Sequence, residues 1–308
     1  VLSGLAFGLG GMVPVALLID RWFIDDRGIA LGICAAGTGF CGIVIPLFVE
    51  SMVSRMDLHA IFYIEAAAVL AMSILLYLLL RDDPQGMGLS PFSRGGANGS
   101  GGTTVKREAA LQGHAPIPRS AMWVLWLSMI LVGAASDPSF GHFSVLYSAE
   151  GYDMIMISRL LALASAALLV GKILLGWVSD RIGIFRSDHL FFAMLTIGLA
   201  SCSMAPLHST MIACIGMVCT GLGFSTMTVG ISIWAFDLSG GRTFTKTMKL
   251  FQIYNSLGKV MLGAMPGIVA DLTGSYVPAY IAYTAFAIFA WVTLQTIYIR
   301  YVNKKAEP

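Results

Sequence analysis

The sequence is poor in charge: Asp, Glu, Lys and Arg make up only 12% of its 308 residues, about half the share of an average soluble chain. The basic residues are dispersed rather than gathered into a patch, so nothing indicates a nucleic-acid partner. The five cysteines form no CxxC pair and have no histidines between them, which argues against zinc motifs and favours free thiols that pack as small apolar groups. A soluble globular domain is not a natural interpretation.

Apolar residues, in contrast, are abundant: 57% of the chain is hydrophobic and the mean hydropathy is +0.79. They gather into about nine runs, long enough as helices to approach the ~30 Å hydrocarbon core of a bilayer. We therefore expect an all-α, polytopic helical bundle in a membrane. The predicted spans are residues 1–19, 28–49, 58–80, 120–147, 155–178, 189–206, 210–236, 249–270 and 276–300.

Residues 81–119 interrupt this pattern with a Gly/Ser tract at 95–102 and scattered bases, and nothing there can bury a core. We predict a linker between residues 1–80, which hold three helices, and residues 120–308, which hold six. Nearly all basic residues fall in alternate loops on the linker's side, so the positive-inside rule places the linker and the C-terminus in the cytoplasm. The expected location is the cell membrane, with several passes.

A polar motif closes the span at 155–178. Gly176 is small enough to let another helix approach, Asp180 can face the positive N-terminal end of a neighbouring helix, and Arg181 can pair or meet anionic headgroups. Gly183 ends the motif. The plainer alternative is a polar turn flanked by a positive-inside charge.

The pattern Gly176-x-x-x-Asp180-Arg181-x-Gly183 resembles the loop motif between the second and third helices of each six-helix half in the major facilitator superfamily. Here it would be the second-half copy. We expect it to hold together the cytoplasmic ends of the second and fifth helices of that half.

A second segment, WFIDDRGIALGICAAGTGFCG, resembles the loop between the fourth and fifth helices, and the start of the fifth, in the monocarboxylate-transporter and oxalate:formate-antiporter branch of that superfamily. The matching residues are Trp22, Phe23, Arg27, Gly28, Ala30, Gly32, Gly37, Gly39 and Gly42. Asp25 and Asp26 depart from the family, which usually has basic residues there. The resemblance implies twelve helices, with the first three absent from this chain.

Gly37–Gly42 also fits the dinucleotide pattern GxGxxG, but it lies inside an apolar run and follows no strand. We expect the glycines of this run to form a smooth strip for close helix packing. The segment from Ser256 to Lys259 has the SxxK form of certain serine enzymes without their partner motifs. We therefore expect no enzyme activity and no cofactor.

Lys172 and Lys259 lie inside apolar spans, where an ammonium costs at least about 2.5 kcal/mol. Lys259 is near the middle of its span, whereas Lys172 is close enough to the boundary to reach it by snorkelling. In the oxalate:formate antiporter, which this chain resembles, the eighth and eleventh helices each present a basic residue to the substrate. Lys172 stands where monocarboxylate carriers have an arginine. Together, the two lysines and this resemblance predict a carrier of small mono- or dicarboxylates.

Such a carrier would work by alternating access, as an exchanger or as a proton symporter. Asp137 and Glu65 are the candidate proton-coupling residues, although a polar position near the outer mouth explains both as well. Leu168 stands where monocarboxylate carriers have an acidic residue one turn before the arginine, so the resemblance does not carry their lysine-and-aspartate proton coupling over to this chain. The alternatives are a carrier of another substrate class, a channel-like or structural membrane protein, or a non-transporting truncated remnant. We expect a monomer in the lipid bilayer.

Overall fold

The computed structural model describes residues 10–53, 55–93, 118–239 and 243–302. Within these ranges the chain is helical, and its single β pairing is an isolated bridge between Phe23 and Phe92. The predicted all-α fold class is confirmed. Six helices or helix runs of the described chain are long and apolar enough to cross a membrane: residues 27–45, 59–79, 119–141, 154–182, 210–239 and 277–302.

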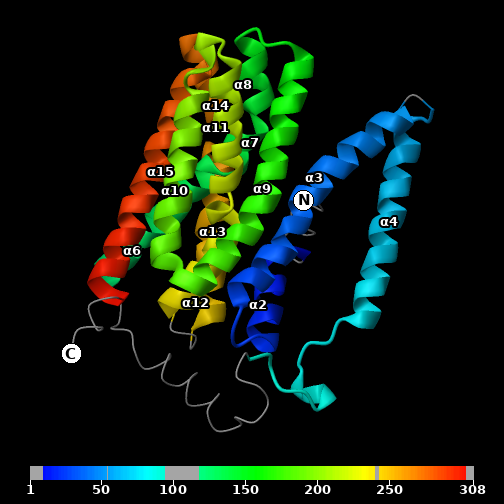
Figure 1. Cartoon of the computed structure of the whole chain (residues 1–308), viewed down its shortest axis with the longest axis vertical. Helices are drawn as coiled ribbons and strands as arrows, with labels where there is room; N and C mark the ends of the chain where they lie inside the picture. The colour runs from blue at the N-terminus through cyan, green and yellow to red at the C-terminus, as the bar shows by residue number, and fades with distance from the viewer. Residues whose placement is uncertain (1–9, 54, 94–117, 240–242, 303–308) are drawn as a thin grey trace.

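The first part of the chain contributes three helices: α2 (Met12–Trp22), α3 (Arg27–Val53) and α4 (Leu58–Leu79). α3 lies against α9 of the second part, whereas α4 stands away from the second-part bundle (Figure 1). Large apolar side chains cover α4 and most of them are exposed, as in a helix whose surroundings are lipid or other apolar helices. The short helix η1 (Gln85–Met87) follows α4.

The second part forms the main bundle (Figure 1). Its core is rich in aromatic side chains that are fully buried, including Phe192, Trp234 and Tyr280. Its helices are α6 (Arg119–Ala135), α7 (Asp137–Gly141), α8 (Phe143–Ala149), α9 (Met154–Ile182), α10 (Ile184–Cys202), η2 (Ala205–Leu207), α11 (Thr210–Gly223), η3 (Thr226–Gly230), α12 (Ile231–Ser239), α13 (Phe244–Leu262), α14 (Met265–Thr273), α15 (Val277–Ile297) and η4 (Tyr298–Val302).

One end of the bundle carries the end of α2, the starts of α3 and α6, and residues 81–93 (Figure 1). We call this end the linker face. The Gly/Ser tract at 95–102 and most of the predicted linker lie outside the described residues. Arg81–Ser93 runs back along the α2–α3 turn, where Ile24 N donates to the Phe92 carbonyl at 2.9 Å and Phe92 N donates to the Trp22 carbonyl at 2.8 Å.

Three predicted spans differ in detail from the observed helices. The span at 120–147 is broken before Pro138, and the span at 249–270 is broken at Gly263, just before Pro266. Proline has no N–H to continue a helical ladder, which explains both breaks. α10 begins at Ile184, earlier than the predicted residue 189, so Asp188 lies within a helix rather than in a loop.

Candidate functional site

The contact between α3 and α9 depends on glycines. A Cβ added at Gly176 would clash with the Gly28 carbonyl, and a Cβ at Gly32 would clash with the Lys172 carbonyl. A Cβ at Gly39 would lie 2.9 Å from Leu169 Cβ. The two helices therefore touch backbone to backbone, as small residues allow in membranes. The predicted strip is confirmed for these positions of α3.

The prediction is wrong for Gly37 and Gly42. No described atom lies within 4 Å of the Cβ position of either residue. Both glycines lie on an exposed side of α3. Glycine spacing alone did not distinguish the side of the helix that packs from the side that does not.

Asp180, near the end of α9, caps the start of α3. Its Oδ1 accepts a hydrogen bond of 2.9 Å from Gly28 N, and its Oδ2 accepts one of 2.8 Å from Ile29 N. The first N–H groups of a helix have no partner within the helix and carry partial positive charge, so a carboxylate is favourable there. The prediction that Asp180 holds the fifth helix of the second half is wrong. Asp180 instead joins the second part of the chain to α3.

The rest of that motif lies at the same corner. The Arg181 guanidinium lies 4.3 Å from the centroid of the Trp177 ring, a cation–π contact within α9. Gly183 has φ of +82°, a conformation that glycine adopts without strain, and it separates α9 from α10. What resembled a loop motif is therefore the last helical turn of α9 and a one-residue turn.

Arg27, at the start of α3, connects three helices. Its Nη1 lies 3.3 Å from Asp20 Oδ1, and its Nε donates to the Phe23 carbonyl at 2.6 Å. Its guanidinium lies 4.0 Å from the centroid of the Phe236 ring on α12. Arg27 thus joins α2 and α3 to the second part of the chain at the linker face.

The neighbouring aromatic pair holds the start of the linker. Trp22 Nε1 donates to the Arg81 carbonyl at 3.0 Å, and the rings of Phe23 and Phe92 lie 5.8 Å apart. Asp25, which departs from the family pattern, accepts a hydrogen bond of 2.8 Å from Ser93 Oγ. Its role in the structure is therefore a local contact with the linker.

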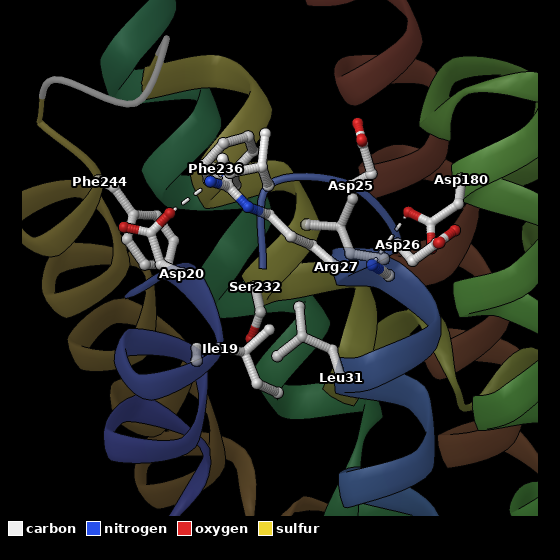
Figure 2. Close-up of a pocket in the computed structure, with 14 residues that line it drawn as sticks. Ile19, Asp20, Asp25, Asp26, Arg27, Leu31, Asp180, Ser232, Phe236 and Phe244 are labelled. Carbon is white, nitrogen blue, oxygen red and sulfur yellow. Dashed lines mark hydrogen bonds and ion pairs between the residues drawn. The ribbon is translucent and has the colours of Figure 1, made fainter. Parts of the chain in front are cut away.

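A cavity of about 480 Å³ opens among these residues, between α2 and α3 on one side and α12 and α13 on the other (Figure 2). Its polar lining includes Asp20, Asp25, Asp26, Arg27, Asp180 and Ser232. Ser232 is fully buried, and its hydroxyl makes no hydrogen bond within the described chain. Sequence reasoning missed Asp20 and Ser232, although acidic residues on both sides of the aromatic pair were a signal for the former.

Lys172 is buried between α9 and α3, with 3% of its surface exposed. Its Nζ donates to the Ala35 carbonyl at 3.3 Å and to the Thr38 hydroxyl. The snorkelling alternative is therefore wrong for this conformation, because the ammonium points across the contact between the two parts of the chain.

Lys259 pairs with Asp137. Its Nζ lies 2.6 Å from Asp137 Oδ2, and the exposed fractions of the two side chains are 24% and 67%. Asp137 stands where α6 gives way to α7, and Lys259 lies in the last turn of α13, just before the break at Gly263. Asp137 also interacts electrostatically with Lys172. Asp137 thus contacts Lys259 directly and acts on Lys172 only through space, and we call these three residues the central cluster.

Glu65 is not part of this cluster. It lies half-exposed on α4, a helix whose main contact is with α3 and which stands apart from the second-part bundle (Figure 1). Of the two candidate proton-coupling residues, only Asp137 contacts one of the lysines, Lys259, in the described structure. The pairing spans 122 residues, which is why hydropathy alone did not reveal it.

Apolar helices of membrane length define a polytopic membrane protein, with two lysines inside its spans and a cavity between two parts of the chain. The chain belongs to the Major Facilitator Superfamily, whose profile matches residues 1–263. This relationship is to transporters and not to enzymes.

Three curated relatives share distant similarity. The chain is 28% identical over 198 residues to the MFS-type transporter hasB of Aspergillus fumigatus, covering 60% of this chain and 41% of that protein. It is 22% identical over 291 residues to monocarboxylate transporter 13 of Rattus norvegicus, covering 93% and 63%. It is 25% identical over 201 residues to the probable transporter MCH2 of Saccharomyces cerevisiae, covering 62% and 38%. The chain thus spans less than two thirds of each.

Proposed function

We propose that this protein is a secondary transporter of small organic anions, mono- or dicarboxylates, that works by alternating access. The observation that carries the proposal is the placement of two lysines inside apolar spans, Lys172 buried against α3 and Lys259 partly exposed beside Asp137. Charged side chains inside membrane spans are rare and mark substrate pathways in membrane proteins. The name of the rat relative, monocarboxylate transporter 13, supports the same substrate class.

The anion binds by replacing Asp137 as the partner of Lys259. The Lys259–Asp137 pair is partly exposed, so a carboxylate that enters the site can reach the ammonium. A charge-assisted hydrogen bond in such a site is typically worth ~1.5–3 kcal/mol.

Movement between faces follows from how Lys172 is held. Its ammonium donates to Ala35 and Thr38 of α3, whereas Lys172 itself belongs to the second part of the chain. A bound anion that draws Lys172 away from α3 weakens the contact between the two parts, so the loaded carrier changes conformation more easily than the empty one. At the linker face, the contacts of Asp180 with α3 and of Arg27 with Phe236 must separate when that face opens.

Asp137 decides between the two coupling modes. If Asp137 stays ionised, it occupies Lys259 whenever the anion leaves, and the protein exchanges one anion for another. If Asp137 takes up a proton, Lys259 is freed for the anion, and proton and anion travel together. The two modes share one site, and we propose that the protein acts in the plasma membrane with its linker and C-terminus in the cytoplasm.

Binding in detergent or lipid tests the substrate class. We expect small carboxylates to raise the melting temperature of the purified protein by mass action, and sugars and cationic compounds to leave it unchanged. Lys259→Gln should weaken carboxylate binding by about ten- to more than hundred-fold, the equivalent of ~1.5–3 kcal/mol. Lys259→Arg should be milder but not neutral, because a planar guanidinium replaces a compact ammonium.

Lys249 provides the matched control, since it is an exposed lysine on the same helix. Lys249→Gln should bind carboxylates as the wild type does. A neutral or cationic compound that bound equally well with and without both central lysines would overturn the anion proposal and favour a carrier of another substrate class. A folded protein that bound none of these compounds would favour the truncated-remnant alternative.

A further inference from the structure

A buried carboxyl group outside the central cluster and the cavity has no function assigned so far. Asp188 lies near the start of α10, close to the linker face, and none of its surface is exposed. Its Oδ2 accepts a hydrogen bond of 2.8 Å from Trp234 Nε1 on α12. Its Oδ1 makes no hydrogen bond within the described chain.

The surroundings of Asp188 are aromatic and supply no positive charge. Trp234 is fully buried and stacks on Phe192, with ring centroids 5.8 Å apart and an interplanar angle of 13°. The titratable groups that interact electrostatically with Asp188 are Asp237 of α12 and Tyr298 of η4, neither of which is cationic. On the α9 side, Ser187 faces the neutral Ser179 at 3.0 Å.

His189 follows Asp188 on the same helix but belongs to another cluster. Its ring lies 5.3 Å from Phe185 and 5.8 Å from Trp291, and its Nδ1 accepts from Trp291 Nε1 at 3.2 Å. Arg186 is exposed. On the α15 side, Gln295 donates to the Phe185 carbonyl and does not reach Asp188. No described residue that packs around Asp188 therefore supplies a counter-charge.

We propose that Asp188 is a proton-binding site that controls separation of the ends of α10 and α12, which meet through the contacts of Trp234 with Asp188 and Phe192. An isolated ionised carboxylate in such surroundings is strongly unfavourable, and a buried group relieves this by taking up a proton. With these ends packed, Asp188 carries a proton on its carboxyl group. When they separate, water reaches the carboxyl, the O–H bond breaks and the proton passes to that water.

The site differs from the central cluster in chemistry and position. Asp137 exchanges its partner with an anion, whereas Asp188 responds to proton concentration alone. Its existence does not depend on the proposed anion, and Asp188→Asn should leave stabilisation by carboxylates unchanged. Asp271, an exposed acid of α14, provides the matched control.

Infrared spectroscopy of the purified protein in lipid tests the protonation directly. At neutral pH we expect the C=O stretch of a protonated carboxylic acid in the wild type. It should disappear in Asp188→Asn and persist in Asp237→Asn and Asp271→Asn. A wild type without the band, or a band that survives Asp188→Asn, would overturn the proposal.

Trp234→Phe gives a second route should Asp188→Asn fail to fold. It removes the hydrogen bond to Oδ2 and keeps the carboxyl group, so the band should shift in frequency without being lost. An unchanged band would mean that the protonated acid is not Asp188.

Opening is measured by thiol labelling at Ser187→Cys, in a background without the five native cysteines. Ser187 is fully buried beside Asp188, so its labelling reports separation of the helix ends. If opening releases one proton, the labelling rate should rise with pH in the protein that keeps Asp188. Each pH unit should raise that rate about tenfold more than in the same protein with Asp188→Asn added. Equal pH slopes in the two backgrounds would refute the coupling.

Discussion

Asp180 of α9 accepts a hydrogen bond of 2.9 Å from the backbone N–H of Gly28, 152 residues earlier in the chain. The contact joins the two parts of the protein at the linker face and requires both partners. Gly28 has no side chain to keep α9 away, and Asp180 supplies the charge that the N-terminus of α3 favours.

The first prediction concerns this cap. Asp180→Asn keeps the shape of the side chain but removes its charge, and a charge at a helix N-terminus is typically worth ~0.3–1 kcal/mol. The change should shift the balance toward an open linker face, measured as faster thiol labelling of Ser232→Cys, which lines the cavity. Carboxylate binding should be retained. Loss of binding with unchanged labelling would contradict the assignment, and Asp271→Asn serves as the control.

A second prediction concerns the packing of α3 on α9. Gly176→Ala places a methyl group against the Gly28 carbonyl, and overpacking of this kind typically costs about 1–3 kcal/mol. We expect a lower melting temperature and weaker association of the two parts. Gly37→Ala is the matched control because no described atom lies within 4 Å of its Cβ position. A Gly176→Ala protein as stable as Gly37→Ala would argue against the close contact.

The third prediction separates exchange from proton symport. Asp137→Asn removes the internal competitor for Lys259, which lies 2.6 Å from it. Carboxylates should bind more tightly in this variant, and the pH dependence of binding that Asp137 contributes should disappear. Isothermal titration at several pH values measures both. Weaker binding in Asp137→Asn would show that Asp137 supports the site rather than competes with the substrate.

A fourth prediction concerns orientation in the membrane. Gln85 lies at the linker face and Ser51 lies near the opposite end of α3, and both residues are exposed. The positive-inside rule predicts that a membrane-impermeant thiol reagent labels Ser51→Cys in intact cells and reaches Gln85→Cys only after permeabilisation. The reverse pattern would invert the topology and place the linker outside.

Hydrophobic pattern and composition determined the class of this protein, because nothing but a membrane accommodates so many long apolar runs with so little charge. The same pattern identified Lys172 and Lys259 as unusual, since each is a cation inside such a run. Asp180 was expected at a helix N-terminus for reasons of charge alone. These conclusions need only local sequence and the cost of charge in lipid.

The tertiary structure decided which groups meet. Hydropathy is a property of one helix at a time, so it does not specify that Lys259 pairs with Asp137 or that Asp180 caps α3 instead of a helix of its own half. It also assigned Asp188 to a loop, because a polar residue near a span end lowers the local hydropathy. Only the contacts of Trp234 of α12 with Asp188 and Phe192 of α10 show that this acid is buried in the bundle. Burial of a polar group depends on its neighbours in space, and those neighbours come from distant parts of the chain.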